Sequence, residues 1–345
     1  MSFCNCNIVK IRNRKFLLPK RQEEELQPTE SESLTDEALT SCSINPIIAS
    51  CSTPTFSTDI PCPKTLQSLL FKHQQENYDK LCLLYSVTCS FSPSHIYITG
   101  TTSESLNEFA VKLRELIKKV SQNSPPTHFL ALPLITNTLT KEQYTSFLSV
   151  LESSIKESAK FIPQQLVSAP SFHLTLSVLN LYTLEDVQQV NQILIENFDR
   201  LREMLPNPLV LRLGELAVMK GSIETCKVLH FEIQDDENKR KVEEFTVVVK
   251  NLLKNFIAPK NFKEKLRLHA TVLNTKYGQH KKFSNVSVNV SSIMSFDSSV
   301  FSPIEIPCFM LYKMQKDRIF GYCVEKCFPI NGENNEQMIA RIKNC

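Results

Sequence analysis

The chain has 345 residues, a formal net charge of +3 and a hydrophobic fraction of 42%. This length favours two folded units, and the composition is that of a soluble protein with a packed core. No apolar run reaches the roughly 18–20 residues of a membrane helix, and we expect no membrane span. Early charges, from Lys10 to Lys15, argue against a secretory signal peptide. The net charge is too small to indicate nucleic-acid binding by itself.

Cysteine and glycine usage exclude several classes of site. The 12 cysteines are scattered and none forms a C-x-x-C pair, so we expect reduced thiols and no zinc site. The chain has only 6 glycines, and they are far apart. This excludes the P-loop, the dinucleotide-binding G-x-G-x-x-G turn and the G-x-S-x-G elbow. Any phosphate chemistry must therefore work without a glycine-rich loop.

Residues 1–58 are expected to form a mostly disordered tail, because Ser, Thr, Glu and Pro dominate and apolar periodicity is weak. The stretch 10–21 carries six of the basic residues. It fits a nuclear localisation signal, a solvated tail that contacts a partner or, less well, a mitochondrial transit peptide. The composition leaves these alternatives open.

Residues 59–122 are predicted to form a small α/β unit. Apolar residues recur at helical spacing over 65–73 and 77–87, two short strands follow over 87–92 and 95–99, and 103–120 is the clearest amphipathic helix. The order of helix, helix, strand, strand and helix is that of a KH module whose first strand is weak.

Residues 126–331 alternate strands and helices, and 332–345 are expected to be a C-terminal tail. The alternation contains a coarse repeat of strand, helix and strand, and the last strand of each copy carries an H-x-T motif. We predict an α+β protein, with antiparallel sheets and flanking helices in a bilobal second domain.

The two H-x-T motifs are His173–Thr175 and His269–Thr271. They lie 96 positions apart (269 − 173), and each continues into a Leu-Asn pair. One H-x-T motif is weak evidence, since a buried structural histidine is the usual explanation. Two copies with matching extensions at a domain-scale separation are much less expected by chance, and we interpret them as one paired site.

The spacing of these motifs has a chemical meaning. Residues i and i+2 of a strand face the same side, so each histidine shares a face with its threonine. Two such strands side by side would place two imidazoles and two hydroxyls on one wall of a cleft. One imidazole can then accept a proton while the other donates one, and the hydroxyls can bind phosphate oxygens. We predict His173 and His269 as catalytic residues and Thr175 and Thr271 as phosphate-binding residues, with no metal and no cofactor.

Four further residues are candidates for the cleft. His128 and Phe129 lie in an apolar strand, and we interpret His128 as structural or cleft-lining rather than catalytic. Arg267 and Lys276 flank the second motif and would add positive charge, although such residues are more often solvated.

At these residues the chain resembles the two-histidine (2H) phosphoesterase superfamily, which includes bacterial LigT-like RNA ligase/cyclic phosphodiesterases. More closely, it resembles the family of KH-plus-phosphoesterase subunits of activating signal cointegrator complexes. The similarity is carried by IVKIRNRKF (8–16), LLFKH (69–73), THFLALPL (127–134), FHLTLSVLNL (172–181), LRLHATVLNTKY (266–277) and SFD (295–297).

The resemblance implies a KH-like module followed by a LigT-like domain. It also implies a nuclear subunit, present in the cytoplasm as a second location, of a complex for transcription regulation and alkylation-damage repair. The implied partners are RNA or single-stranded nucleic acid and the protein subunits of a cointegrator/helicase complex, without a membrane. In the family, a G-x-x-G loop that clamps the nucleic-acid backbone should follow LLFKH. This chain has no glycine there and carries Glu76 and Asp79, so we expect a degenerate KH-like module.

Two functions from different classes follow. The first is an enzyme that acts on RNA-type phosphoesters such as 2′,3′-cyclic phosphates or 2′–5′ linkages. The second is a catalytically silent scaffold subunit that binds RNA or a nucleotide. A metal-dependent hydrolase is disfavoured, because neither an H-x-x-E-H motif nor a paired carboxylate accompanies the histidines.

Overall fold

The computed structural model describes residues 6–11, 14–19, 55–155, 161–263, 267–277, 286–317 and 321–344. Met1–Ser43 and Ile44–Cys345 are separate compact units. The first unit contains an antiparallel hairpin of β1 (Cys6–Ile11) and β2 (Arg14–Pro19). Most of the tail expected over 1–58 lies outside the described residues, but its boundary was placed too late, because a strand already begins at Phe56.

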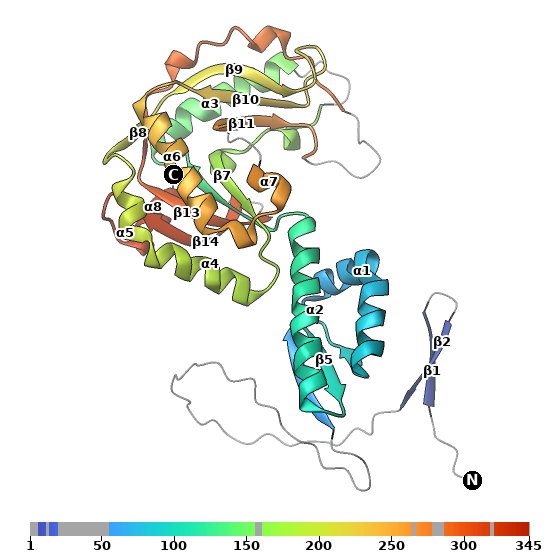
Figure 1. Cartoon of the computed structure of the whole chain (residues 1–345). Coiled ribbons are helices and arrows are strands. Elements are labelled where there is room, and N and C mark those ends of the chain that lie inside the picture. The colour runs from blue at the N-terminus through green and yellow to red at the C-terminus, as the bar shows by residue number, and fades with distance from the viewer. Residues whose placement is uncertain are drawn as a thin grey trace, which may run out of the picture. The chain divides into compact units, whose positions relative to one another are not determined.

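A small three-stranded sheet with two helices precedes the larger domain (Figure 1). Its elements are β3 (Phe56–Pro61), α1 (Lys64–Tyr85), β4 (Thr88–Phe91), β5 (His95–Gly100) and α2 (Ser103–Asn123). β5 lies between β3 and β4, and both pairings are antiparallel. The strand β3 was not predicted, because only Ile60 of its six residues is fully buried and the apolar alternation is weak.

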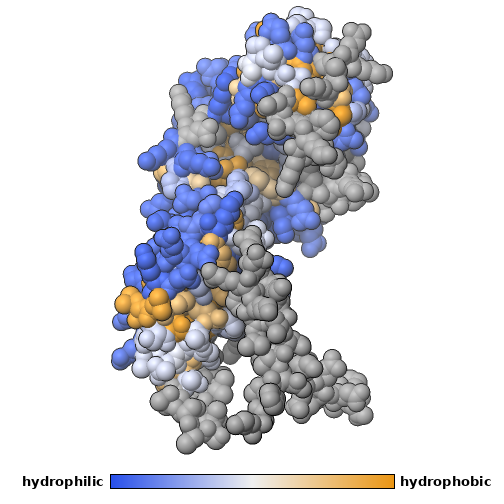
Figure 2. Space-filling view, turned by 90° about the vertical axis from the view of Figure 1, so that its right-hand side faces the viewer, coloured by the Kyte–Doolittle hydropathy of each residue, from blue (hydrophilic) through white to orange (hydrophobic). Residues whose placement is uncertain are grey.

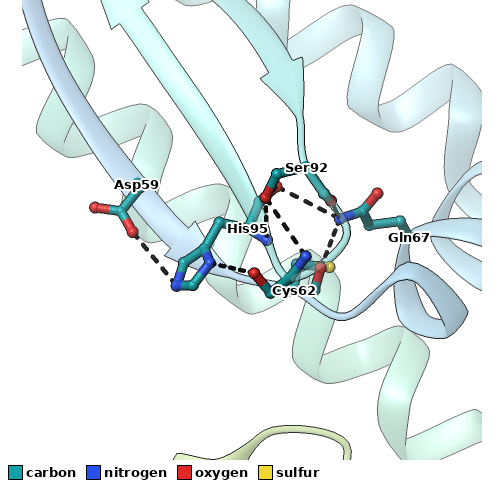
Figure 3. Close-up of polar contacts among 6 residues, drawn as sticks. Asp59, Cys62, Gln67, Ser92 and His95 are labelled. Carbon is teal, nitrogen blue, oxygen red and sulfur yellow. Dashed lines mark hydrogen bonds and ion pairs between the residues drawn. The ribbon is translucent and has the colours of Figure 1, made fainter. Parts of the chain in front are cut away.

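The two helices expected before β4 form one element, α1, with a kink at Gln74. A buried glutamine fixes the first turns of this helix to the loop between β4 and β5 (Figure 3). The Gln67 side chain donates to the carbonyls of Cys62 (2.6 Å), Ser92 (2.7 Å) and His95 (3.4 Å). These contacts satisfy the carbonyls of Cys62 and Ser92 at a helix–sheet junction, and they add to the bond that the His95 carbonyl accepts from the Ser92 amide (2.9 Å).

The second domain is built on a seven-stranded antiparallel sheet with the order β14-β13-β6-β7-β11-β10-β9. Its strands are β6 (His128–Pro133), β7 (His173–Leu179), β9 (Leu213–Lys220), β10 (Val228–Ile233), β11 (His269–Asn274), β13 (Cys308–Asp317) and β14 (Gly321–Pro329). A separate pair joins β8 (Leu209–Leu211) to β12 (Ile304–Ile306). β7 and β11 are neighbours near the centre of the sheet. Each strand begins with its H-x-T motif, so the two motifs lie side by side there.

Helices cover the sheet and form its main core. They are α3 (Thr138–Ile155), α4 (Leu184–Glu196), α5 (Phe198–Glu203), α6 (Glu237–Leu252), α7 (Pro259–Lys263) and α8 (Asn335–Asn344). Leu130 and Leu132 of β6 belong to the main core, whereas Phe129 and Ala131 belong to a smaller cluster on the opposite face. The alternation explains why β6 is an apolar run: both faces of this strand are buried.

The segment 332–345, expected to be a tail, contains the helix α8. Met338 of this helix is fully buried, and Ile339 and Ile342 pack against the same smaller cluster. These apolar positions span little more than one turn of a ten-residue helix. Such a short stretch does not stand out in the sequence as a periodic pattern.

The surface carries an exposed apolar patch at the end of α1. Leu83 is 81% exposed and Leu84 is 72% exposed. Figure 2 shows hydrophobic residues gathered on the small unit to which α1 belongs. Among the helices that the structure describes, none combines the length and apolar character needed to cross a bilayer.

Candidate active site

The two H-x-T motifs lie on neighbouring strands at the centre of the sheet. β7 and β11 are antiparallel, and the pair that aligns them joins Leu174 to Ala270, the middle residues of the two motifs. In this register the histidine of each motif lies opposite the threonine of the other. Alternate residues face the same side of a strand, so both histidines and both threonines lie on one face. Leu174 and Ala270 are fully buried on the other face.

Each histidine is oriented by a backbone carbonyl two residues earlier. Nδ1 of His173 lies 2.7 Å from the carbonyl oxygen of Ser171, and Nδ1 of His269 lies 2.7 Å from that of Arg267. A carbonyl can only accept a hydrogen bond, so Nδ1 carries the proton in both rings. The other nitrogen, Nε2, is then the atom at which each imidazole gains or loses a proton.

One small cavity of about 70 Å³ contains both motifs. This is roughly the volume of two water molecules, which suits a phosphoryl group and is too small for a nucleoside. Nε2 of His173 lies 3.1 Å from Oγ1 of Thr175. The lining consists of Val167, Ser171, His173, Thr175, His269, Thr271, Tyr277 and Tyr322. All four predicted motif residues are therefore brought together in one site.

Aromatic rings surround His173. Phe129 of β6 lies 4.8 Å from the His173 ring, centroid to centroid, at an interplanar angle of 31°. Tyr322 of β14 lies 5.5 Å away and nearly perpendicular, at 84°. Phe129, predicted as cleft-lining, thus supports the histidine from behind and is not part of the cavity wall. The rings restrict the His173 side chain to the rotamer in which Nε2 faces the cavity.

His269 has a different neighbour. The centroid of the His230 ring, on β10, lies 5.3 Å from that of the His269 ring, and the two ring planes are at 80°. His230 is fully buried, and neither of its ring nitrogens has a hydrogen-bond partner among the described residues. Burial is the main cause that lowers the pKa of His230 to about 4, and the nearby His269 and Arg267 lower it further. His230 is therefore neutral at physiological pH. Sequence reasoning assigned it no role.

Three of the predicted cleft residues lie elsewhere. His128 is buried, its Nδ1 is 2.8 Å from Oγ1 of Thr127, and its Nε2 is 3.7 Å from Glu325. Burial lowers the pKa of His128, and Glu325 opposes this effect. His128 therefore has a structural role and does not line the cavity. The Arg267 guanidinium forms a 2.5 Å ion pair with Glu232, and Lys276 is exposed; neither lines the cavity.

Sequence reasoning missed four lining residues: Val167, Ser171, Tyr277 and Tyr322. Tyr277 follows the second motif, but its position after the strand gives no indication of the direction in which it points. The one signal for Tyr322 is the preceding Gly321, which has a positive φ of 77°. A Cβ at Gly321 would lie 2.7 Å from the carbonyl oxygen of Pro170. Glycine thus allows β14 to approach the turn that carries Ser171.

The site holds the parts of a proton-transfer centre. Two imidazoles present Nε2 to one cavity, and hydroxyls lie beside them. Among the described residues, no group of three or more His, Cys, Asp or Glu side chains is arranged to hold a metal ion. An antiparallel sheet that brings two H-x-T motifs to one cavity defines the class of two-histidine phosphoesterase domains.

Comparison with known families gives the same class. Residues 126–323 match the family model of the AKAP7 2′5′ RNA ligase-like domain. The match covers 198 residues (323 − 126 + 1) of 345, more than half of the chain, and the chain belongs to this family. It is a family of LigT-type 2H phosphoesterases.

The chain also resembles solved structures. Crystal structures of E. coli LigT complexed with NADP+ and with 3′-AMP match at 15% and 16% identity, with TM-scores of 0.37 and 0.36; each covers 60% of this chain and 98% of that chain. The crystal structure of the Thermus thermophilus protein TT0787 matches at 17% identity with a TM-score of 0.37, and covers 60% of this chain and 100% of that one. No curated protein matches the chain.

Proposed function

We propose that this domain is a metal-free phosphoesterase that acts on RNA-type phosphoesters, either 2′,3′-cyclic phosphates or 2′–5′ linkages. The observation that carries the proposal is the shared orientation of His173 and His269. Both rings donate Nδ1–H to a backbone carbonyl, so Nε2 is the proton-exchanging nitrogen of both rings, and both rings line one phosphate-sized cavity.

The chemistry follows from two protonation states. One imidazole starts neutral and its Nε2 accepts a proton from the attacking water, while the water oxygen forms a bond to phosphorus. The other imidazole starts protonated and its Nε2 donates to the leaving sugar oxygen as the P–O bond breaks. The hydroxyls of Thr175 and Thr271 bind the non-bridging oxygens. After the reaction the two rings have exchanged protonation states, and a proton exchange with water restores them.

The test is hydrolysis of a panel of 2′,3′-cyclic nucleotides and 2′–5′ oligonucleotides in EDTA. We expect wild-type turnover to survive the chelator, and His173→Ala and His269→Ala each to lower kcat by at least about 100-fold. His73→Ala, an exposed histidine on α1, is the matched control and should keep wild-type activity. A folded protein without turnover on any substrate, but with RNA affinity, would instead support the catalytically silent scaffold.

We further propose that the chain works as a nuclear subunit of an activating signal cointegrator-type complex, with a degenerate KH-like module over 59–122. The segments quoted above support this assignment, as does the order of one strand, a kinked helix, two strands and a helix in the small unit. The kink at Gln74 occupies the place where a G-x-x-G loop would lie. An acidic segment without glycine is a poor phosphate clamp, so we assign this module to protein contacts.

The exposed leucines at the end of α1 support a protein-contact role, because patches of this kind are typical of interaction surfaces. Co-purification of the full chain from nuclear extract, followed by mass spectrometry of its partners, tests the assignment. Recovery with helicase and cointegrator subunits is the expected result. Recovery from the cytoplasm alone, without those subunits, would contradict it.

A further inference from the structure

Two tyrosines share the cavity with the histidines and have no part in the acid–base scheme. Tyr322 is the second residue of β14. Tyr277 lies three residues beyond the end of β11, where its amide donates to the carbonyl of Asn274 (2.9 Å). Both side chains line the same cavity as His173 and His269. Two distant segments of the chain thus contribute phenols to one phosphate-sized space.

Tyr322 is held in place from several sides. Its ring is perpendicular to Phe129 at 4.8 Å and to His173 at 5.5 Å. The backbone before it is fixed by Gly321, whose contact with Pro170 leaves no room for a Cβ. Ring packing and a constrained backbone together give Tyr322 little freedom to rotate, which is the property of a residue that positions another group.

The two tyrosines interact with each other in the lining of this cavity. Burial is the main cause that raises the pKa of Tyr322, and the charge and hydrogen bond of Tyr277 raise it further. The Tyr322 ring is fixed by its packing against Phe129 and His173, so it restricts the positions that the neighbouring Tyr277 side chain can take at the cavity.

The charge balance of the cavity calls for such a donor. Of the residues that the structure places in the lining, none is lysine or arginine. The nearby Arg267 is paired with Glu232. The described lining residues that can stabilise negative charge on phosphate oxygens are the imidazoles, when protonated, and the hydroxyl groups. Hydroxyls fixed in advance are effective here, because they need little reorganisation as charge develops.

We propose that Tyr277 is a third phosphate-binding residue, whose hydroxyl donates to a phosphoryl oxygen in the transition state, and that Tyr322 is the positioning residue that orients it. This inference rests on the phosphoesterase activity proposed above. It adds a group that acts on the phosphoryl oxygens and takes no part in moving the proton.

The test compares Tyr277→Phe, Tyr322→Phe and the double variant with wild type on adenosine 2′,3′-cyclic phosphate in EDTA. We expect Tyr277→Phe to lower kcat by about 10- to 100-fold, with KM changed by less than about threefold. Tyr322→Phe should have a smaller effect. The double variant should match Tyr277→Phe, because Tyr322 acts through Tyr277. The pH profile should keep its shape, since neither phenol transfers a proton.

Tyr97→Phe, at an exposed tyrosine on β5, is the control and should be unchanged. Thermal unfolding of each variant separates a local effect from loss of the fold. A wild-type kcat in a folded Tyr277→Phe variant would overturn the inference and leave the proposed function intact. If wild type has no turnover, the proposed function fails, and calorimetric titration with inorganic phosphate decides the inference. A fivefold or greater loss of affinity in Tyr277→Phe supports it, whereas equal affinity, or no binding by wild type, overturns it.

Discussion

At the residue scale, the two cavity histidines take their tautomer from the backbone. The acceptors are the carbonyls of Ser171 and Arg267, not carboxylates. A neutral carbonyl fixes the ring orientation and the tautomer, so Nε2 is the nitrogen that exchanges a proton in the proposed two-histidine reaction.

His230 allows a prediction about pH and stability. In the folded chain it stays neutral down to a pKa of about 4, whereas an unfolded histidine binds a proton near pH 6.5. The unfolded state therefore binds more protons between these values, and the free energy of unfolding falls as the pH is lowered through this window. The loss contributed by His230 is about 3 kcal/mol at most.

Urea unfolding of wild type and His230→Phe at pH 7.5 and pH 5 measures this contribution. Phenylalanine keeps the ring volume and cannot bind a proton, so the variant should lose less stability than wild type when the pH is lowered. An equal loss in both proteins would show that His230 is not the responsible group. Titrating residues distant from His230 are common to both proteins and cancel in the comparison.

The sequence predicts the histidines and threonines of the site because the H-x-T pattern is local: alternation along one strand decides which side chains share a face. Tyr277 and Tyr322 reach the cavity through tertiary contacts between segments far apart in the chain. The spacing of residues in the sequence therefore does not reveal them as site residues. For a similar reason the sequence left open whether His128 is structural or lines the cleft, and the structure favours the structural role. His128 lies in a cavity-adjacent strand, but its side chain points to the face opposite Phe129 and His173.

At the element scale, the start of β14 depends on Gly321. Its φ is +77°, and an added Cβ would meet the Pro170 carbonyl oxygen at 2.7 Å. Gly321→Ala should lower the free energy of unfolding by about 2–4 kcal/mol, since it adds a backbone clash to the cost of the left-handed conformation. It should also lower activity, because the shifted turn carries the Ser171 carbonyl that orients His173.

Gly332→Ala is a matched control for this substitution. Gly332 has a similar φ of +83°, but nothing lies within 4 Å of its added Cβ. This variant should lose only about 1 kcal/mol and keep its activity. Urea unfolding and turnover of both variants check the prediction, and equal effects at the two sites would argue against the close contact as the cause.

The helix α1 depends on Gln67 in the same way. Gln67→Met keeps the side-chain length but removes the donor shared by the carbonyls of Cys62, Ser92 and His95 (Figure 3). The His95 carbonyl keeps the Ser92 amide as donor, but the Cys62 and Ser92 carbonyls lose this partner, which costs about 1–3 kcal/mol. Amide hydrogen exchange in the full chain should accelerate over 56–123 and stay unchanged over the larger sheet. Gln75→Met, at an exposed position on the same helix, should change neither.

The sequence predicts most elements but not their ends. Buried runs such as β6 and amphipathic helices such as α2 have strong periodicity. The strand β3 and the helix α8 have only one fully buried residue each, and pattern analysis fails where so few positions face the core. The two helices predicted within α1 correspond to its two parts, which meet at the kink where Gln74 has non-helical backbone angles.

At the scale of the whole molecule, the order of elements along the chain predicts the fold class better than it predicts the order of strands in the sheet. The alternation of strands and helices over about 200 residues indicates an α+β domain. It does not indicate that both halves join into one seven-stranded sheet, because β7 and β11 pair across 96 positions of sequence (269 − 173). Pairings of such separation leave no local signal.

The pair of Leu174 and Ala270 lies on an approximate local dyad that relates the two motifs. A substrate that entered the cavity in the opposite orientation would meet the same groups with their duties exchanged. By microscopic reversibility, the same geometry serves bond formation as well as bond cleavage. The protein therefore imposes no direction on the reaction. For the proposed reaction, the relative free energies of the bound species and their concentrations decide whether the phosphoester bond is broken or formed.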